Sequence, residues 1–164
     1  MTTACSDRKA GKAKSTSPNA LYQKEVPMTL TPIQAVQGLL SNLTDLKNVK
    51  SVTTPDVTYV SLSEHNPALR AILPWAGGHK GPEEMAKVFE DVAKAWETKA
   101  FEVRDVIEQG DRVAFFGSFT YRARNTGKEV TSLFSLYAKV TDGKVSYVQF
   151  MEDTFATAAS VTKN

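Results

Sequence analysis

Side chains that could move a proton are few in this sequence. Glu152 and Asp153 stand side by side in FMEDTFATAASV, residues 150–161, where an apolar strand is expected to end. The two histidines, His65 and His79, lie in loop segments next to Pro, Trp and Gly residues. A carboxylic acid in an apolar cavity has a pKa raised toward neutrality, which suits general acid–base catalysis. The chemistry open to these groups depends on which of them the fold brings into one cavity.

Other catalytic chemistries lack their motifs. The sequence has no Gly-x-Ser-x-Gly nucleophile turn, no phosphate-binding loop and no histidine pair at a metal-ligand spacing. The single cysteine, Cys5, excludes an internal disulfide and a thiolate metal cluster. We therefore expect neither a metal nor an organic cofactor.

Length and charge indicate one domain with a basic tail. The chain has 164 residues and a formal net charge of +2, and five basic against two acidic side chains fall within residues 1–30. This segment is rich in Ser, Thr, Ala, Lys and Gly and is expected to be a flexible tail, with the domain spanning 31–164. The body is nearly neutral and its longest apolar run, residues 113–121, is too short for a bilayer. We expect no nucleic-acid partner, no membrane association and a cytoplasmic location.

The first half of the body reads as helices around one strand. Thr31 and Pro32 have the chemistry of a helix start, and Pro82 with two following acids starts the strongest helix. Apolar spacing predicts helices over 33–43, 46–52, 66–73 and from 82 to about 97, and a strand over 55–62, with a loop or short strand in PWAGGHKG.

The second half changes to a period of two from Phe101 onward. Thr126-Gly127 and Asp142-Gly143 supply hairpin turns, so this half is expected to be an antiparallel sheet.

If both turns are two-residue loops, pairing assigns every side chain to a face. Asp153 then lies opposite Ser132 on the apolar face, and Glu152 lies on the mixed face. The apolar face is predicted to carry Phe115, Phe119, Tyr121, Phe134, Leu136, Tyr147, Gln149 and Met151. The mixed face carries four large apolar side chains, Phe116, Leu133, Val148 and Phe150.

This order of elements, ending in DGKVSYVQFMEDTFATA, is similar to the nuclear transport factor 2-like superfamily. The chain more narrowly resembles its SnoaL-like branch, through the hairpin Asp142 to Val145, the later Asp153-Thr154 pair and the segment from Trp75 to Met85. The resemblance covers about residues 32–160. It implies an α+β, cone-shaped domain whose strongly curved antiparallel sheet wraps N-terminal helices and leaves an apolar cavity.

The resemblance also implies a site. SnoaL-like cyclases use an Asp on the sheet, assisted by a His, to move a proton next to a carbonyl. Asp153 is the candidate acid or base, and His65, which strand alternation puts on the face of Tyr59, is the candidate assistant; His79 is expected to be exposed. Asp153 could instead cap the residues that follow it. The predicted cavity lining is Tyr59, Trp75, Phe119, Tyr121, Phe134, Gln149 and Met151.

Several functions stay open within this family. Ketosteroid isomerisation is disfavoured, because Ser61 stands where those enzymes place an Asp and the helix over 33–43 has no Tyr. We expect cofactor-independent isomerisation, cyclisation or dehydration of an apolar carbonyl compound. The alternatives are a noncatalytic carrier of a lipid, terpenoid or carotenoid, and a dimerising assembly module. The four apolar residues of the mixed face suit a homodimer, or a sheet covered by the N-terminal segment.

Overall fold

The computed structural model describes residues 30–163, so the expected tail and Cys5 lie outside the described residues. Five helices and six strands follow in the order α1 (Pro32–Ser41), α2 (Leu46–Val52), β1 (Thr53–Ser61), α3 (Pro67–Ile72), β2 (Gly77–Lys80), α4 (Pro82–Ala95), β3 (Trp96–Gln109), β4 (Arg112–Ala123), β5 (Glu129–Thr141), β6 (Lys144–Glu152) and α5 (Thr154–Val161) within this part of the chain. No described helix is long and apolar enough to cross a membrane.

The helix starts follow the predicted chemistry. Thr31 and Gln34 form a reciprocal capping box at the start of α1, with Pro32 as the first helical residue. Asn66 caps α3 by accepting a hydrogen bond from the Leu69 amide. Pro82 opens α4, with two acids in its first turn. The predicted helices are therefore confirmed, with α1 and α4 each ending about two residues early.

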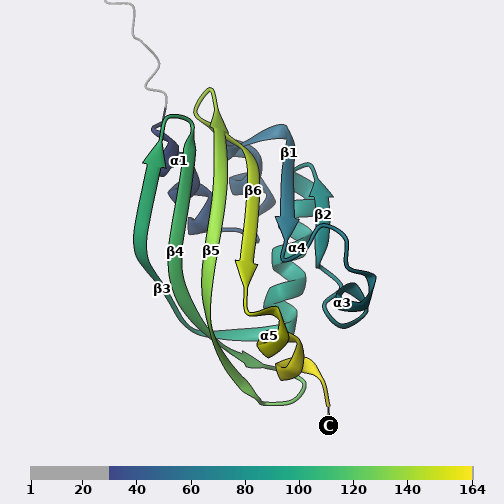
Figure 1. The fold of residues 1–164 in the computed structure, drawn as a ribbon. Helices are drawn as coiled ribbons and strands as arrows, with labels where there is room; N and C mark the ends of the chain where they lie inside the picture. Colours follow the sequence, from purple (N-terminus) through teal and green to yellow (C-terminus); the bar gives the residue numbers. More distant parts are fainter. Residues whose placement is uncertain (1–29, 164) are drawn as a thin grey trace, which may run out of the picture.

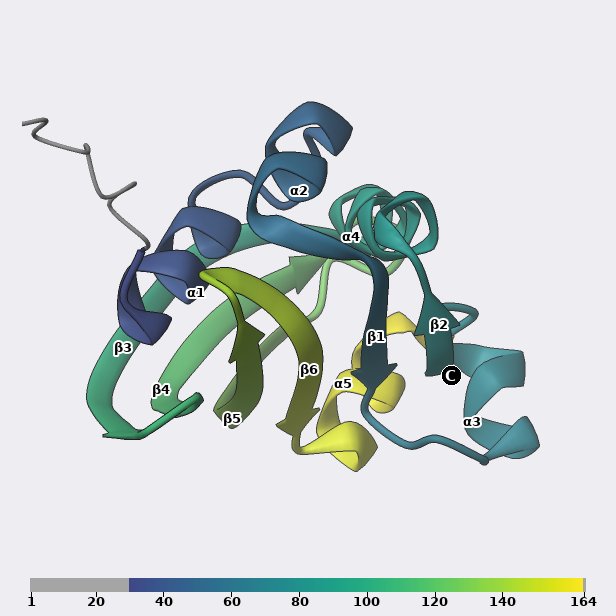
Figure 2. The same cartoon turned by 90° about the horizontal axis from the view of Figure 1, so that it is seen from above.

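The six strands form one curved, unclosed sheet in the order β2-β1-β6-β5-β4-β3. Figure 2 shows the strands as an arc that encloses α1 and α4, and Figure 1 shows α5 at the end of β6. The predicted α+β architecture is confirmed. All neighbouring strands are antiparallel except β1 and β6, which run parallel, a pairing that the antiparallel prediction missed.

Register irregularities accompany the curvature of the sheet. The pairing of β3 with β4 shifts at Thr98/Ala100 and again at Val103/Asp105; such bulges bend a strand and increase its twist. Gly117 of β4 allows β3 to approach closely, because a Cβ there would lie 2.0 Å from the Glu102 carbonyl oxygen and 2.7 Å from the Phe134 ring. The concave face then closes on α1 and α4 through buried Val36, Leu39, Met85, Phe115 and Phe119.

The two hairpins differ from each other. Asp142 and Gly143, with φ of 50° and 74°, form the expected two-residue turn between β5 and β6. The β4–β5 loop, residues 124–128, is longer than the predicted two residues, which shifts the register of β4 with β5 by two and leaves the side chains of these two strands on their predicted faces.

Candidate active site

An internal cavity of about 90 Å³ lies between the concave sheet face and helices α1 and α4. Its lining is almost entirely apolar, with Tyr59, Ser61, Tyr121 and Glu152 as the polar side chains. The apolar lining residues are Leu39, Leu40, Leu43, Leu62, Trp75, Met85, Phe89, Val92, Trp96, Phe101, Leu136, Val148 and Phe150. One ionisable acid therefore lies in an otherwise hydrophobic chamber, which is the usual composition of a small-molecule site.

Glu152 faces this cavity because β6 contains a bulge. Val140 pairs with Val145 as predicted, but Lys139 pairs with Tyr147, so Ser146 is an extra residue in β6. Every later residue of β6 is displaced by one, which exchanges the two faces of the strand. Val148, Phe150 and Glu152 consequently point inward.

The cavity raises the pKa of the Glu152 carboxyl group. Burial raises its pKa to about 7, and the nearby Asp153 charge adds to the rise, while a hydrogen bond from Thr157 acts in the opposite direction. A carboxyl group in this range exchanges its proton readily near neutral pH, as a general acid or base must.

Two phenols accompany this carboxyl group. Burial, with a smaller contribution from the Glu152 charge, raises the pKa of Tyr121 to about 12. Burial likewise raises the pKa of Tyr59 above its ordinary value; the Ser61 hydroxyl lowers it, and Glu152 and Tyr121 contribute smaller rises. The three groups are thus close enough to interact electrostatically. Both phenols stay protonated at neutral pH and can donate hydrogen bonds to an oxygen in the cavity.

His79 supports the cavity wall from outside. Its Nε2 lies 2.8 Å from the Trp75 carbonyl oxygen, and its ring stacks on Tyr59 with centroids 6.2 Å apart. On the next part of the wall, Trp96 donates from Nε1 to the Ser160 hydroxyl at 3.0 Å. This bond ties the start of β3 to α5.

Of the residues predicted to line the cavity, some line it, some lie behind its lining and some face the other side of the sheet. Tyr59, Trp75 and Tyr121 line the cavity. Phe119 and Phe134 lie on the concave face but behind the lining: Phe119 stacks on Tyr121 at 4.2 Å, and Phe134 stacks on Phe150 at 5.4 Å.

The prediction that Gln149 and Met151 face the cavity is wrong. The bulge turns both residues to the outer face, together with Tyr147, whose hydroxyl donates to Gln149 at 3.2 Å. The same shift moves Val148 and Phe150 from the predicted outer face into the cavity.

The predicted placement of Asp153 in the cavity is also wrong. Asp153 is exposed and is the N-cap of α5, where it accepts a hydrogen bond from the Ala156 amide at 3.1 Å. This is the capping role that the sequence offered as the alternative to a place in the cavity. His65 is exposed as well, because β1 ends at Ser61 and Leu62 adopts a φ of 65°, which breaks the alternation used to place it. His65 lies in a separate surface pocket with Glu64, Asn66 and Arg70.

Sequence patterns missed Glu152 and Ser61 as cavity residues. Ser61 could have been found, since it alternates with Tyr59 along one strand. Glu152 could not, because no Gly or Pro marks the bulge at Ser146. Within residues 30–163 no three His, Cys, Asp or Glu side chains are grouped so that they could hold a metal ion.

Comparison with known proteins relates this chain to one family and to two named relatives. A family model described as a SnoaL-like domain matches residues 40–148. Patulin synthesis protein F of Aspergillus clavatus is 40% identical over 119 residues, covering 71% of this chain and 60% of that protein. Patulin biosynthesis cluster protein F of Penicillium expansum is 35% identical over 135 residues, covering 79% of this chain and 68% of that protein.

Solved structures share the fold. An NTF2-like protein from Burkholderia xenovorans superimposes with a TM-score of 0.69 at 22% identity, covering 80% of this chain and 95% of that one.

Proposed function

Because this chain belongs to the SnoaL-like family within the nuclear transport factor 2-like superfamily, we propose that it is a small-molecule isomerase, cyclase or dehydratase that works by proton transfer. The observation that carries the proposal is the position of Glu152, a carboxyl group with a pKa of about 7 in an apolar cavity. Glu152 takes over the role that the sequence suggested for Asp153.

The proposed reaction begins at a carbon next to a carbonyl group. The Glu152 carboxylate removes a proton from this carbon, and the electron pair of the broken C–H bond moves to the carbonyl oxygen to give an enolate. Tyr59 and Tyr121 donate hydrogen bonds to this oxygen and stabilise its charge. In an isomerisation Glu152 returns the proton to another carbon of the conjugated system. In a cyclisation the enolate carbon attacks a second carbonyl, and the alkoxide that forms takes the proton from Glu152. In a dehydration a hydroxyl group on the carbon beyond leaves as water after it accepts that proton.

The substrate class follows from the lining and the relatives. The apolar walls favour a molecule with little charge around the reacting carbonyl. Two relatives carry names that place them in patulin synthesis, which supports an intermediate of small-molecule biosynthesis as the substrate.

The test compares two adjacent carboxylates. Glu152→Gln keeps the shape of the side chain and removes its proton exchange, so turnover of a carbonyl substrate should fall at least about a hundredfold while its dissociation constant changes little. Asp153→Asn is the matched control, because Asn remains a good helix cap and the side chain lies outside the cavity. Equal turnover in wild type and Glu152→Gln would contradict the acid–base role of Glu152, whereas binding without turnover in the wild type would favour the alternative, a carrier of an apolar ligand.

We also propose that two copies pair through the outer sheet face. Val148 and Phe150, which were predicted to lie on this face, point into the cavity instead. Leu133 is 68% exposed on the outer face, and Phe116 and Met151 lie exposed on the neighbouring strands. A surface of this kind favours burial against a partner.

A further inference from the structure

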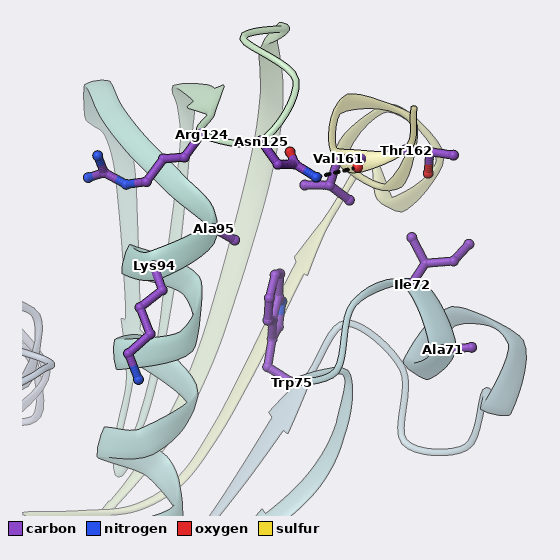
Figure 3. A pocket seen from close by; sticks show the side chains of 9 residues that line it. All are labelled: Ala71, Ile72, Trp75, Lys94, Ala95, Arg124, Asn125, Val161 and Thr162. Carbon is purple, nitrogen blue, oxygen red and sulfur yellow. Dashed lines mark hydrogen bonds between the residues drawn. The ribbon is translucent and has the colours of Figure 1, made fainter. Parts of the chain in front are cut away.

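A second hollow lies directly beyond one wall of the cavity. This cleft measures about 630 Å³ and opens at the surface. Figure 3 shows it between α3, the end of α4, the β4–β5 loop and the end of α5. Its lining consists of Ala71, Ile72, Trp75, Lys94, Ala95, Arg124, Asn125, Val161 and Thr162. Its volume falls in the range of about 300–1,000 Å³ typical of ligand pockets.

The polar side chains around the cleft already have partners. Asn125 donates to the Val161 carbonyl oxygen at 2.7 Å, and Arg124 donates from Nε to the Ala93 carbonyl oxygen at 3.2 Å. Lys94 bonds Asp91 at 3.2 Å. By contrast Ile72 is 45% exposed and has its apolar surface available. Together with Trp75 and Val161, Ile72 gives the cleft an apolar surface that an uncharged arm of a ligand can cover.

Trp75 separates the cleft from the cavity. It is the one described side chain that lines both. Its ring packs edge-on against Trp96 at 5.0 Å, and Trp96 stacks on Tyr121 at 5.8 Å. The acid-bearing chamber is thus bounded on this side by a pair of indoles.

The small size of the cavity makes the adjoining cleft important for binding a substrate. A volume of about 90 Å³ holds only a few water molecules, so the reacting end of a substrate fits there but a larger molecule does not. Any further part of the substrate must leave the chamber through one of its walls.

We propose that the cleft is the outer half of the substrate site, that it holds an apolar arm of the substrate, and that Trp75 governs passage between the two halves. This inference rests on the proposed function, since it places the reacting carbonyl beside Glu152. It makes Trp75 and Ile72 determinants of substrate size and not of the chemical step.

The experiment uses phenol and 4-alkylphenols from ethyl to hexyl as probes, with binding to the full chain measured by calorimetry. The phenol head resembles an enol and should enter the cavity, while the alkyl chain should enter the cleft. Affinity should rise up to about fourfold per methylene group that is buried. Nuclear Overhauser contacts should join the terminal methyl group of 4-hexylphenol to Ile72 and Val161.

Two variants distinguish binding in the cleft from a general loss of affinity. Ile72→Gln should weaken 4-hexylphenol at least about tenfold and leave phenol within about twofold. Ile107→Gln is the control, because Ile107 is 55% exposed on β3 and lines neither hollow. Affinity that does not rise with chain length, equal effects of Ile72→Gln on all probes, or methyl contacts to Leu40 and Leu43 instead would overturn the inference. A Glu152→Gln variant with full turnover would overturn the proposed chemistry alone, because probe binding does not require turnover.

Discussion

Glu152 and Asp153 are adjacent in sequence but have opposite surroundings. Glu152 lines the cavity, whereas Asp153 is exposed and caps α5 through the Ala156 amide. The last residue of β6 thus supplies the acid, and the first residue beyond it ends the strand and starts a helix. This arrangement places one carboxyl group with a raised pKa in the cavity, next in sequence to another that caps the backbone of α5.

The first prediction concerns the pH dependence of turnover. A base must be ionised, and the Glu152 pKa of about 7 means that its carboxylate form grows as pH rises through neutrality. We expect kcat/KM to increase about tenfold per pH unit below pH 7 and to level off above it. Rates measured between pH 5 and 9 test this. A profile that is flat from pH 5 to 9 would show that the essential group is not Glu152.

The second prediction concerns stability. Because the folded pKa of Glu152 lies above its ordinary value of 4.5, the folded state binds the proton more tightly and becomes less stable as pH rises from about 4.5 to 7. The ionised carboxylate should therefore cost about 3 kcal/mol above pH 7. Glu152→Gln should recover up to about this amount at pH 8 and much less at pH 4.5, as measured by urea unfolding. Equal gains in the free energy of unfolding at the two pH values would contradict the raised pKa of Glu152.

Much of the fold could be predicted because its signals are local. The caps at Thr31 and Asn66 and the tight turn at Asp142-Gly143 each depend on a few adjacent residues. The faces of β4 and β5 were also predictable, since an error of two residues in the loop length preserves alternation. The parallel pairing of β1 with β6 depends on contacts between distant segments and has no local signal.

The site depended on one residue that the sequence does not mark. Ser146 is the extra residue of the β6 bulge, where its hydroxyl lies 3.1 Å from that of Thr141 and 3.3 Å from the Lys139 carbonyl oxygen. Because a serine gives no signal of a bulge, the sequence predicts regular alternation along β6 and places Asp153, instead of Glu152, in the cavity. Tyr59, Trp75 and Tyr121 were placed correctly because they do not follow the bulge.

The third prediction tests the bulge. Deleting Ser146 should remove the bulge and place Tyr147 directly after Val145, still paired with Lys139, so that Val148, Phe150 and Glu152 keep facing inward. Because no apolar side chain becomes exposed and no further carboxylate becomes buried, the free energy of unfolding should fall by less than about 2 kcal/mol. Unfolding by urea, compared with Ser146→Ala as control, measures the effect. A loss of more than about 4 kcal/mol, the cost expected for turning Val148 and Phe150 outward, would contradict the assignment of Ser146 as the extra residue.

The fourth prediction concerns assembly through the outer face. Leu133 is 68% exposed on β5, and placing a charge there should oppose burial against a second copy. We expect the native chain to sediment as a dimer and Leu133→Glu as a monomer with an intact cavity. Leu46→Glu, an equally drastic change at a 37% exposed position on α2, should leave the dimer unchanged. A Leu133→Glu chain that still sediments as a dimer would contradict pairing through this face.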